Sequence, residues 1–213
     1  MATTETVNRK DATRKDEGQV PGSNKNLEGL RDLFADAPQM GKTALDNMIR
    51  TAKLMPPASS VESAGRAGRR RGKVSELTVI APVAKGGAKR LHGVLDAMGG
   101  NFHGAELVGT LHNMRFVFLD NDTKVLFATA YDGEWDAYIN DFATKIPDQM
   151  DLLFSAIEGW PGIRSPSVKD FIAKYQITAD AWYVANPSLT VVESRRLERM
   201  GKAVDEFLDK VSG

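Results

Sequence analysis

The chain contains three histidines, His92, His103 and His112, and no cysteine. The lack of cysteine excludes disulfides, thiolate nucleophiles, iron–sulfur clusters and cysteine-type zinc sites. His92 lies in a predicted helix and His103 in a glycine-flanked loop, and neither has neighbours that indicate a reaction. His112 is therefore the main candidate for imidazole chemistry.

His112 lies in an apolar stretch, LHNMRFVFLD (111–120), that reads as a β-strand. Because side chains alternate along a strand, we expect His112 to share a face with Thr110, Met114 and Phe116. A neutral imidazole in these surroundings can bind haem iron or act as a base. It can equally be a core histidine that bonds to a backbone carbonyl or a tyrosine, and both interpretations stay open.

Arg115 is expected on the opposite face of this strand, together with Asn113. A guanidinium group can hold a carboxylate or a haem propionate through two parallel hydrogen bonds. Arg115 can instead pair with Asp132 or Glu134. Asp132 precedes Gly133 at a predicted strand-to-helix turn, where a carboxylate either caps the helix or takes part in catalysis.

Two aromatic residues, Tyr131 and Trp135, flank this turn and can line an apolar pocket or belong to the core. The sequence predicts His112 and Asp132 as catalytic residues, and His112, Arg115, Tyr131 and Trp135 as cofactor-binding residues. No metal site is predicted, because the chain has no His-x-x-His or His-Glu spacing.

Charge and hydropathy restrict the classes of partner. The chain has 213 residues, with 28 basic and 28 acidic side chains, so its formal net charge is zero. This balance makes nucleic acid an unexpected partner, because binding to phosphates needs an excess of basic residues. No apolar run approaches the ~18 residues of a membrane span, and the start of the chain lacks a signal-peptide core. We expect a cytoplasmic protein without a membrane partner.

The composition divides the chain into four segments. Residues 1–25 are polar and predict a disordered tail. Residues 26–55 carry apolar residues at helical spacing on both sides of Pro38 and predict a helical hairpin, whose apolar stripes need a groove on the main domain or on a partner. Residues 56–75 predict a basic flexible linker, for which nucleic-acid contact ranks as a weak alternative. Residues 76–213 predict the folded domain.

Within this domain, residues 76–186 predict the order strand, helix, strand, strand, helix, two inserted helices and strand. This is the ferredoxin-like βαββαβ order of the α+β class, in which an antiparallel sheet carries both helices on one face. A second copy or flanking helices must then cover the other face. The expected strands are 77–83, 107–120, 124–131 and 178–186, and the expected helices are 88–98, 134–142, 149–157 and 167–176.

A final helix is predicted after Thr190. Thr190 and Glu193 have the spacing of a capping box, in which each residue bonds to the backbone of the other. The apolar stripe of this helix consists of Leu197, Met200, Val204, Phe207, Leu208 and Val211.

Three segments, LHNMRFVFLD (111–120), LFATAYDGEWDAYINDFA (126–143) and DLLFSAIEGWPG (151–162), resemble poorly characterised bacterial ferredoxin-like domains of the dimeric α/β-barrel group. The resemblance covers residue 76 to the C-terminus. The group includes cofactor-free monooxygenases, haem-degrading enzymes and dye-decolourising peroxidases. The peroxidases carry a Gly-x-x-Asp-Gly motif, of which this chain has Asp132-Gly133, with Thr129 at the first glycine position.

The resemblance implies a homo-oligomer and a small-molecule oxidoreductase or monooxygenase-like activity, with haem as the implied cofactor. Its pocket would lie beside the hairpin 107–131. The alternative is a non-catalytic association module of the same fold, in which the helices of residues 27–54 dock a partner protein. The alternative accounts for the N-terminal extension, which an enzyme would not need.

Overall fold

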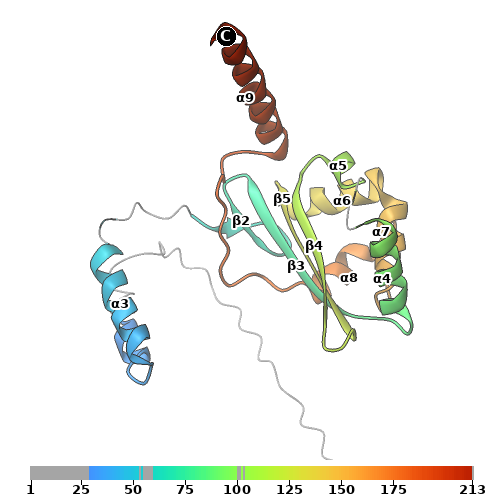
Figure 1. The fold of residues 1–213 in the computed structure, drawn as a ribbon. Helices are drawn as coiled ribbons and strands as arrows, with labels where there is room; N and C mark the ends of the chain where they lie inside the picture. The colour runs from blue at the N-terminus through green and yellow to red at the C-terminus, as the bar shows by residue number, and fades with distance from the viewer. Residues whose placement is uncertain (1–28, 53, 55–59, 100–101, 103, 213) are drawn as a thin grey trace, which may run out of the picture. The chain divides into compact units, whose positions relative to one another are not determined.

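The computed structural model describes residues 29–52, 54, 60–99, 102 and 104–212 (Figure 1). The described residues divide between two compact units, with the boundary after Ser60. The predicted disordered tail and the start of the predicted linker lie outside the described residues. Among the described helices, none combines the length and the apolar character that crossing a membrane requires.

The first unit contains helices α2 (Leu30–Leu33) and α3 (Gln39–Ala52), which lie on either side of Pro38. Arg31 of α2 pairs with Asp46 of α3 at 3.0 Å. The buried residues of α3 are Leu45 and Ile49, one turn apart on the same face of the helix.

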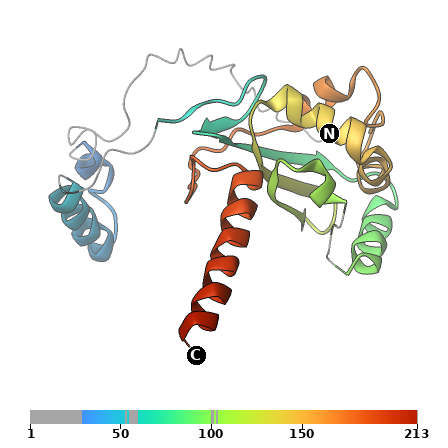
Figure 2. The same cartoon turned by 90° about the horizontal axis from the view of Figure 1, so that it is seen from above.

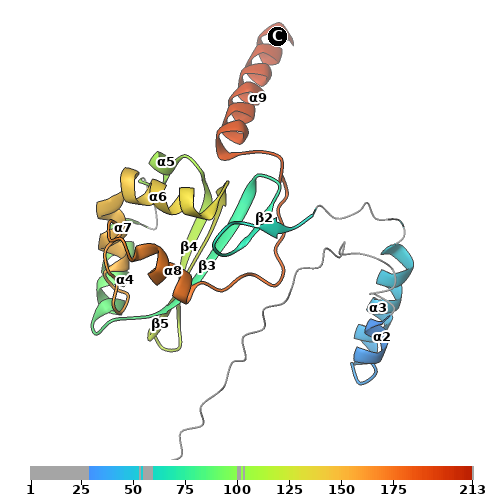
Figure 3. The same ribbon diagram turned by 180° about the vertical axis from the view of Figure 1, so that it is seen from behind.

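The second unit is an α+β fold built on a five-stranded antiparallel sheet with strand order β1-β2-β3-β5-β4 (Figures 1 and 3). The strands are β1 (Glu62–Ser63), β2 (Arg69–Arg71), β3 (Val74–Pro82), β4 (Leu111–Leu119) and β5 (Lys124–Asp132). The helices are α4 (Gly87–Ala97), α5 (Ala105–Val108), α6 (Trp135–Lys145), α7 (Pro147–Phe154), α8 (Val168–Tyr175) and α9 (Val191–Ser212).

One face of the sheet packs against α6, α7 and α8, while α9 leaves on the other side, as Figure 2 shows with α6–α8 in yellow to orange and α9 in red. In the helix expected at 134–142, Trp135, Tyr138, Ile139 and Phe142 have the spacing of one helix face, and all four are buried. The core between sheet and helices includes Leu77, Val79, Phe127, Tyr131, Trp135, Tyr138, Ile139, Phe142, Leu153, Phe154 and Ile172.

The strands expected at 107–120 and 124–131 leave residues 121–123 for a turn, and the structure has a turn there. Asp120, Asn121 and Asp122 all have positive φ angles, of 52°, 53° and 64°. Asp and Asn enter this left-handed region more easily than other non-glycine residues. The Thr123 amide closes the turn by donating to the Asp120 carbonyl at 3.3 Å.

The outer edge of β3 differs from the prediction. Residues 69–71, assigned to a flexible linker, form β2 and pair with the start of β3 through a tight turn at Gly72 and Lys73. The predicted strand 178–186 is wrong, because β2 already occupies the edge that this strand needs. The segment follows the same edge with isolated bonds only, from Ile177 N to Thr78 O at 2.8 Å and from Lys73 N to Pro187 O at 2.7 Å.

A buried carboxylate connects β2 to this irregular segment. Glu76 of β3 is only 3% exposed. Its Oε1 accepts the backbone N–H groups of Arg69 and Ala179, at 3.1 and 3.2 Å, and its Oε2 accepts the Thr78 hydroxyl at 3.3 Å. The side chain therefore joins β2 and the segment after Gln176 to β3.

The first residues of the predicted strand 107–120 belong to α5, and β4 starts only at Leu111. A β-bulge between Leu111 and Asn113 makes His112 the extra residue of this strand. Leu111, Met114 and Phe116 all contact the core, whereas His112 lies with Asn113 on the other face. The predicted face shared by His112, Met114 and Phe116 is therefore wrong, because the bulge shifts the alternation by one residue.

Candidate functional site

His112 and Asp132 lie at neighbouring strand ends on the sheet face away from α6–α8. The His112 Nε2 atom is 2.7 Å from Asp132 Oδ1, and their side chains are 23% and 10% exposed. The Asp132 amide donates to the carbonyl of Thr110 at 2.8 Å, which holds the end of β5 beside the start of β4. The bulge in β4 then brings the imidazole onto the carboxylate.

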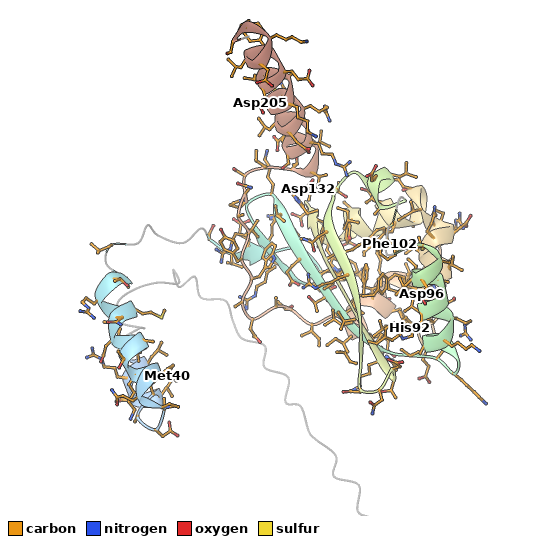
Figure 4. The ribbon with its side chains drawn as sticks, viewed as in Figure 1. Met40, His92, Asp96, Phe102, Asp132 and Asp205 are labelled. Carbon is orange, nitrogen blue, oxygen red and sulfur yellow. The ribbon has the colours of Figure 1, made fainter. Side chains whose placement is uncertain are left out.

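Asp132 has a second role at the base of α9, where Figure 4 labels it. Its Oδ2 accepts the backbone N–H of Val191, the first residue of α9, at 2.9 Å. The first amides of a helix have no partner within the helix, and a negative charge there is favourable. One carboxylate therefore orients His112 and anchors the last helix at the same time.

A cleft of about 240 Å³ opens beside this pair, between the sheet and the irregular segment 182–186. It is smaller than the roughly 300–1,000 Å³ pockets that hold drug-sized ligands. Its wall includes aromatic, amide and hydroxyl side chains. The residues that line it are Val74, His112, Asn113, Ala130, Trp182, Tyr183, Val184, Ala185, Asn186 and Ser194.

This arrangement gives His112 the features of an oriented base. A neutral imidazole that donates its Nε2 proton to Asp132 keeps Nδ1 as an acceptor. A carboxylate in this position selects the tautomer of the imidazole and fixes the orientation of its ring. The pair can therefore remove a proton from a small ligand in the cleft.

The sheet separates two of the other predicted cofactor-binding residues from this cleft. Tyr131 and Trp135 lie in the core on the opposite face, both with 0% exposure. Tyr131 stacks on Tyr138 with ring centroids 3.9 Å apart, and burial raises the pKa of both hydroxyls. The Trp135 Nε1 atom donates to Gln176 at 2.6 Å. Arg115 is exposed on the His112 side but is not part of the cleft wall.

His92 is not part of the cleft wall. His92 stacks on Phe118 with centroids 3.8 Å apart, and its Nε2 lies 3.4 Å from Asp122. His103 lies outside the described residues. In the part of the chain that the structure describes, no three histidine or carboxylate side chains are grouped closely enough to hold a metal ion.

The basic cluster of the predicted linker is engaged by acidic groups from distant parts of the chain. Arg70 pairs with Glu62 at 2.9 Å and also with Glu134, and the hydrogen bond to Glu62 is the main cause that raises the pKa of Arg70. The ion pairs of this cluster are Arg66–Asp170, Arg70–Glu62, Arg70–Glu134 and Lys73–Glu193. These cations therefore stabilise the second unit.

The sequence did not predict the aromatic and polar residues of the cleft wall other than His112 and Asn113, which are Trp182, Tyr183, Asn186 and Ser194. The first three lie in the segment that was interpreted as a strand. The signal that pointed away from a strand was the Asp180-to-Pro187 stretch, which lacks strict alternation and ends in proline.

The anchor of α9 predicts a result for an Asp132→Ala variant. The Val191 amide loses its acceptor, so we expect its hydrogen exchange to accelerate at least tenfold and the protein to lose about 0.5–2 kcal/mol of stability. Amide exchange followed by NMR measures the first effect. Asp132→Asn is the matched control, because its amide oxygen can still accept the N–H. Equal exchange at Val191 in wild type and Asp132→Ala would contradict this anchoring role.

The predicted capping box at Thr190 is confirmed. The Thr190 amide donates to Glu193 Oε2 at 2.7 Å, and the Glu193 amide donates to the Thr190 hydroxyl at 3.2 Å. The hydrogen bond from Lys73, together with those from Thr190, lowers the pKa of the Glu193 carboxyl to about 2. Because this pKa is below the ordinary value of 4.5, Glu193 stabilises the fold above pH 4.5, and the stabilisation disappears as the pH falls towards 2.

A carboxyl titration by NMR should therefore give a midpoint near pH 2 for Glu193. In Lys73→Met, which removes the largest cause of the shift, the midpoint should rise towards the ordinary glutamate value. An unchanged midpoint in that variant would show that Lys73 does not hold the carboxylate.

No protein-family model, curated protein or solved structure matches this chain. Its function must be inferred from the arrangement of its own residues.

Proposed function

We propose that this protein is a self-associating module of the ferredoxin-like type and that α9 is its association surface. The observation that carries the proposal is the apolar stripe of α9, whose six members are each between 50% and 63% exposed. They are Leu197, Met200, Val204, Phe207, Leu208 and Val211.

The stripe has no partner within the described residues of the second unit. Every residue from Arg195 to Ser212 is exposed, so only the first turn of α9 is held by the body of the protein. Single helices of this length are marginal in water, and Gly201 in the middle lowers the helix propensity by about 1 kcal/mol. A second surface that buries the stripe would supply the missing stabilisation.

The sheet supports the ferredoxin-like part of the proposal. The segments β3, α4, β4, β5 and α6 follow the order strand, helix, strand, strand, helix, and β5 lies between β3 and β4. The hairpin of β1 and β2 takes the edge position that the last strand of a ferredoxin-like sheet would occupy. The second unit is an α+β fold, and we interpret it as a variant of the ferredoxin-like order in which a hairpin replaces the last strand.

The first unit provides a second candidate surface. Leu33, Met40 and Met48 of its two helices are more than half exposed. This supports the proposal that residues 27–54 dock a partner protein in addition to the association through α9.

Solution mass tests the association. The full chain should have about twice the mass of one 23.3 kDa chain by sedimentation equilibrium, and a chain that ends at Ser194 should be monomeric. Deleting residues 1–60 should leave the association through α9 intact. A full chain that stays monomeric at about 100 μM would contradict the proposal.

A second proposal rests on the 2.7 Å pair of His112 and Asp132 at the wall of the cleft. It assigns to the cleft an oxidoreductase or monooxygenase-like activity on a small molecule. His112 removes a proton from the substrate, and Asp132 orients the imidazole. The size of the cleft restricts the substrate to a compound smaller than most drug-sized ligands.

Haem, which the resemblance implied, does not fit these residues. The cleft of about 240 Å³ is too small for a macrocycle larger than most drug-sized ligands. Tyr131 and Trp135, which the sequence predicted as cofactor-binding residues, lie on the other side of the sheet.

Fragment screening by NMR tests the cleft without knowledge of the substrate. Small fragments that bind should shift the signals of His112 and Trp182 together, and His112→Ala should weaken their binding.

Titration with haemin should give the same absorbance change in wild type and His112→Ala. A Soret band that only the wild type develops would restore the haem hypothesis.

A further inference from the structure

The apolar stripe of α9 has the spacing of a coiled coil. Its members at 197, 200, 204, 207 and 211 are separated by three, four, three and four residues. This is the a and d spacing of a heptad repeat, whose average of 3.5 residues keeps one seam facing a partner helix. Leu197, Val204 and Val211 take the a positions, and Met200 and Phe207 take the d positions.

We propose that α9 pairs with α9 of a second copy as a parallel, two-stranded coiled coil that begins at Leu197. This inference rests on the proposed association function and names its partner, orientation and register. It requires no residue of the first unit.

The residues at the a positions favour two parallel strands. Two of the three, Val204 and Val211, are β-branched, and β-branched residues at a favour parallel dimers. The seam starts one turn after the residues that anchor the helix. Glu193, which occupies the preceding d position, is held at 2.7 Å by Lys73 of its own chain. The anchor and the seam therefore use different parts of α9.

The flanking positions select the parallel orientation. In a parallel pair, residues at g face residues at e of the next heptad in the other copy. Ala203 then faces Leu208 of the second copy, which extends the apolar seam, and Arg196 faces Gly201. Neither contact places like charges together.

Antiparallel pairing is less favourable in both available registers. If Leu197 lies opposite Phe207 of the second copy, Arg196 of each copy faces Lys210 of the other, and like charges at this position are repulsive. If Val204 lies opposite Phe207 instead, Leu197 has no apolar partner. Only the parallel register buries all five a and d residues in matching layers.

The charged residues of α9 leave the seam clear. Asp205, which Figure 4 labels on this helix, falls at position b. Glu198 and Lys202 fall at b and f and pair with each other at 2.7 Å. These positions face water in a two-stranded coil.

The chain has no cysteine, so single cysteines report the pairing directly. In the parallel register, Cys introduced by Leu197→Cys or Val211→Cys faces its own counterpart, within the reach of a disulfide. In the antiparallel registers the two copies of residue 211 lie about 16–27 Å apart along the axis, at about 1.5 Å per residue. Asp205→Cys, on the outer face, is the matched control.

Mild oxidation of the full-length variants, followed by non-reducing electrophoresis, is the readout. Both Leu197→Cys and Val211→Cys should form covalent dimers at least about tenfold faster than Asp205→Cys. A dimeric mass with no excess cross-linking at either position would overturn the parallel coil and leave the association through α9 intact. A trimeric mass would overturn the two-stranded state. A monomeric mass would overturn the association itself.

Discussion

Replacing Val204 with lysine should convert the proposed α9 dimer into a monomer. Val204 is the middle a residue of the α9 stripe and is 54% exposed in the single chain, so it has surface to bury against a second copy. Lysine would bring two ammonium groups together inside the seam. Each chain would also lose the burial of a valine, which contributes about 1.5 kcal/mol or more. We therefore expect the dissociation constant to rise at least about 100-fold.

Sedimentation velocity over a concentration series measures this constant. Asp205→Lys is the matched control, because it introduces the same side chain at the neighbouring position on the outer face, and it should leave the mass unchanged. Circular dichroism of both variants separates loss of association from loss of the fold. A Val204→Lys protein that remains as dimeric as the control would show that the stripe is not the seam.

Replacing Glu76 with alanine should have the largest effect on stability. Its Oε1 is the acceptor for the backbone amides of Arg69 and Ala179. Each buried amide left without a partner costs about 1–3 kcal/mol, and bonds to a charged acceptor are at the upper end. We expect a loss of about 3–5 kcal/mol in the free energy of unfolding and a decrease of roughly 10 °C in Tm.

Urea and thermal unfolding measure this loss. Glu76→Gln is the matched control, because its amide oxygen can still accept from both backbone amides, and it should lose less than half as much. Detachment of the segment after Gln176 should accompany the loss and appear as faster exchange of the Ala179 amide. If the free energies of unfolding of Glu76→Ala and of the wild type differ by less than about 1 kcal/mol, Glu76 does not hold this edge.

The sequence alone determined the features that depend on neighbours within one or two turns. The buried face of α6, the capping box of Thr190 and Glu193 and the turn at Asn121 follow from local spacing and local hydrogen bonding. The heptad spacing of α9 is local in the same sense, because a helix places residues three and four apart on one side whether or not a partner is present.

The tertiary structure decided the candidate site. One extra residue in β4 moved His112 to the sheet face opposite Met114 and Phe116, and strand alternation has no means of showing a bulge in advance. Tyr131 precedes Asp132 in the same strand, and successive strand residues point to opposite faces of the sheet. Because Asp132 lies on the His112 side, Tyr131 lies in the core.

The edge of the sheet was also decided at the tertiary level. Residues 69–71 and 177–187 compete for the same row of hydrogen bonds on β3, and the hairpin is closer in sequence, so it closes at a smaller entropic cost. The acidic partners of the basic cluster come from as far as 120 residues away, as in the pair of Lys73 and Glu193. Local patterns show which residues are basic, but only the folded chain brings their partners to them.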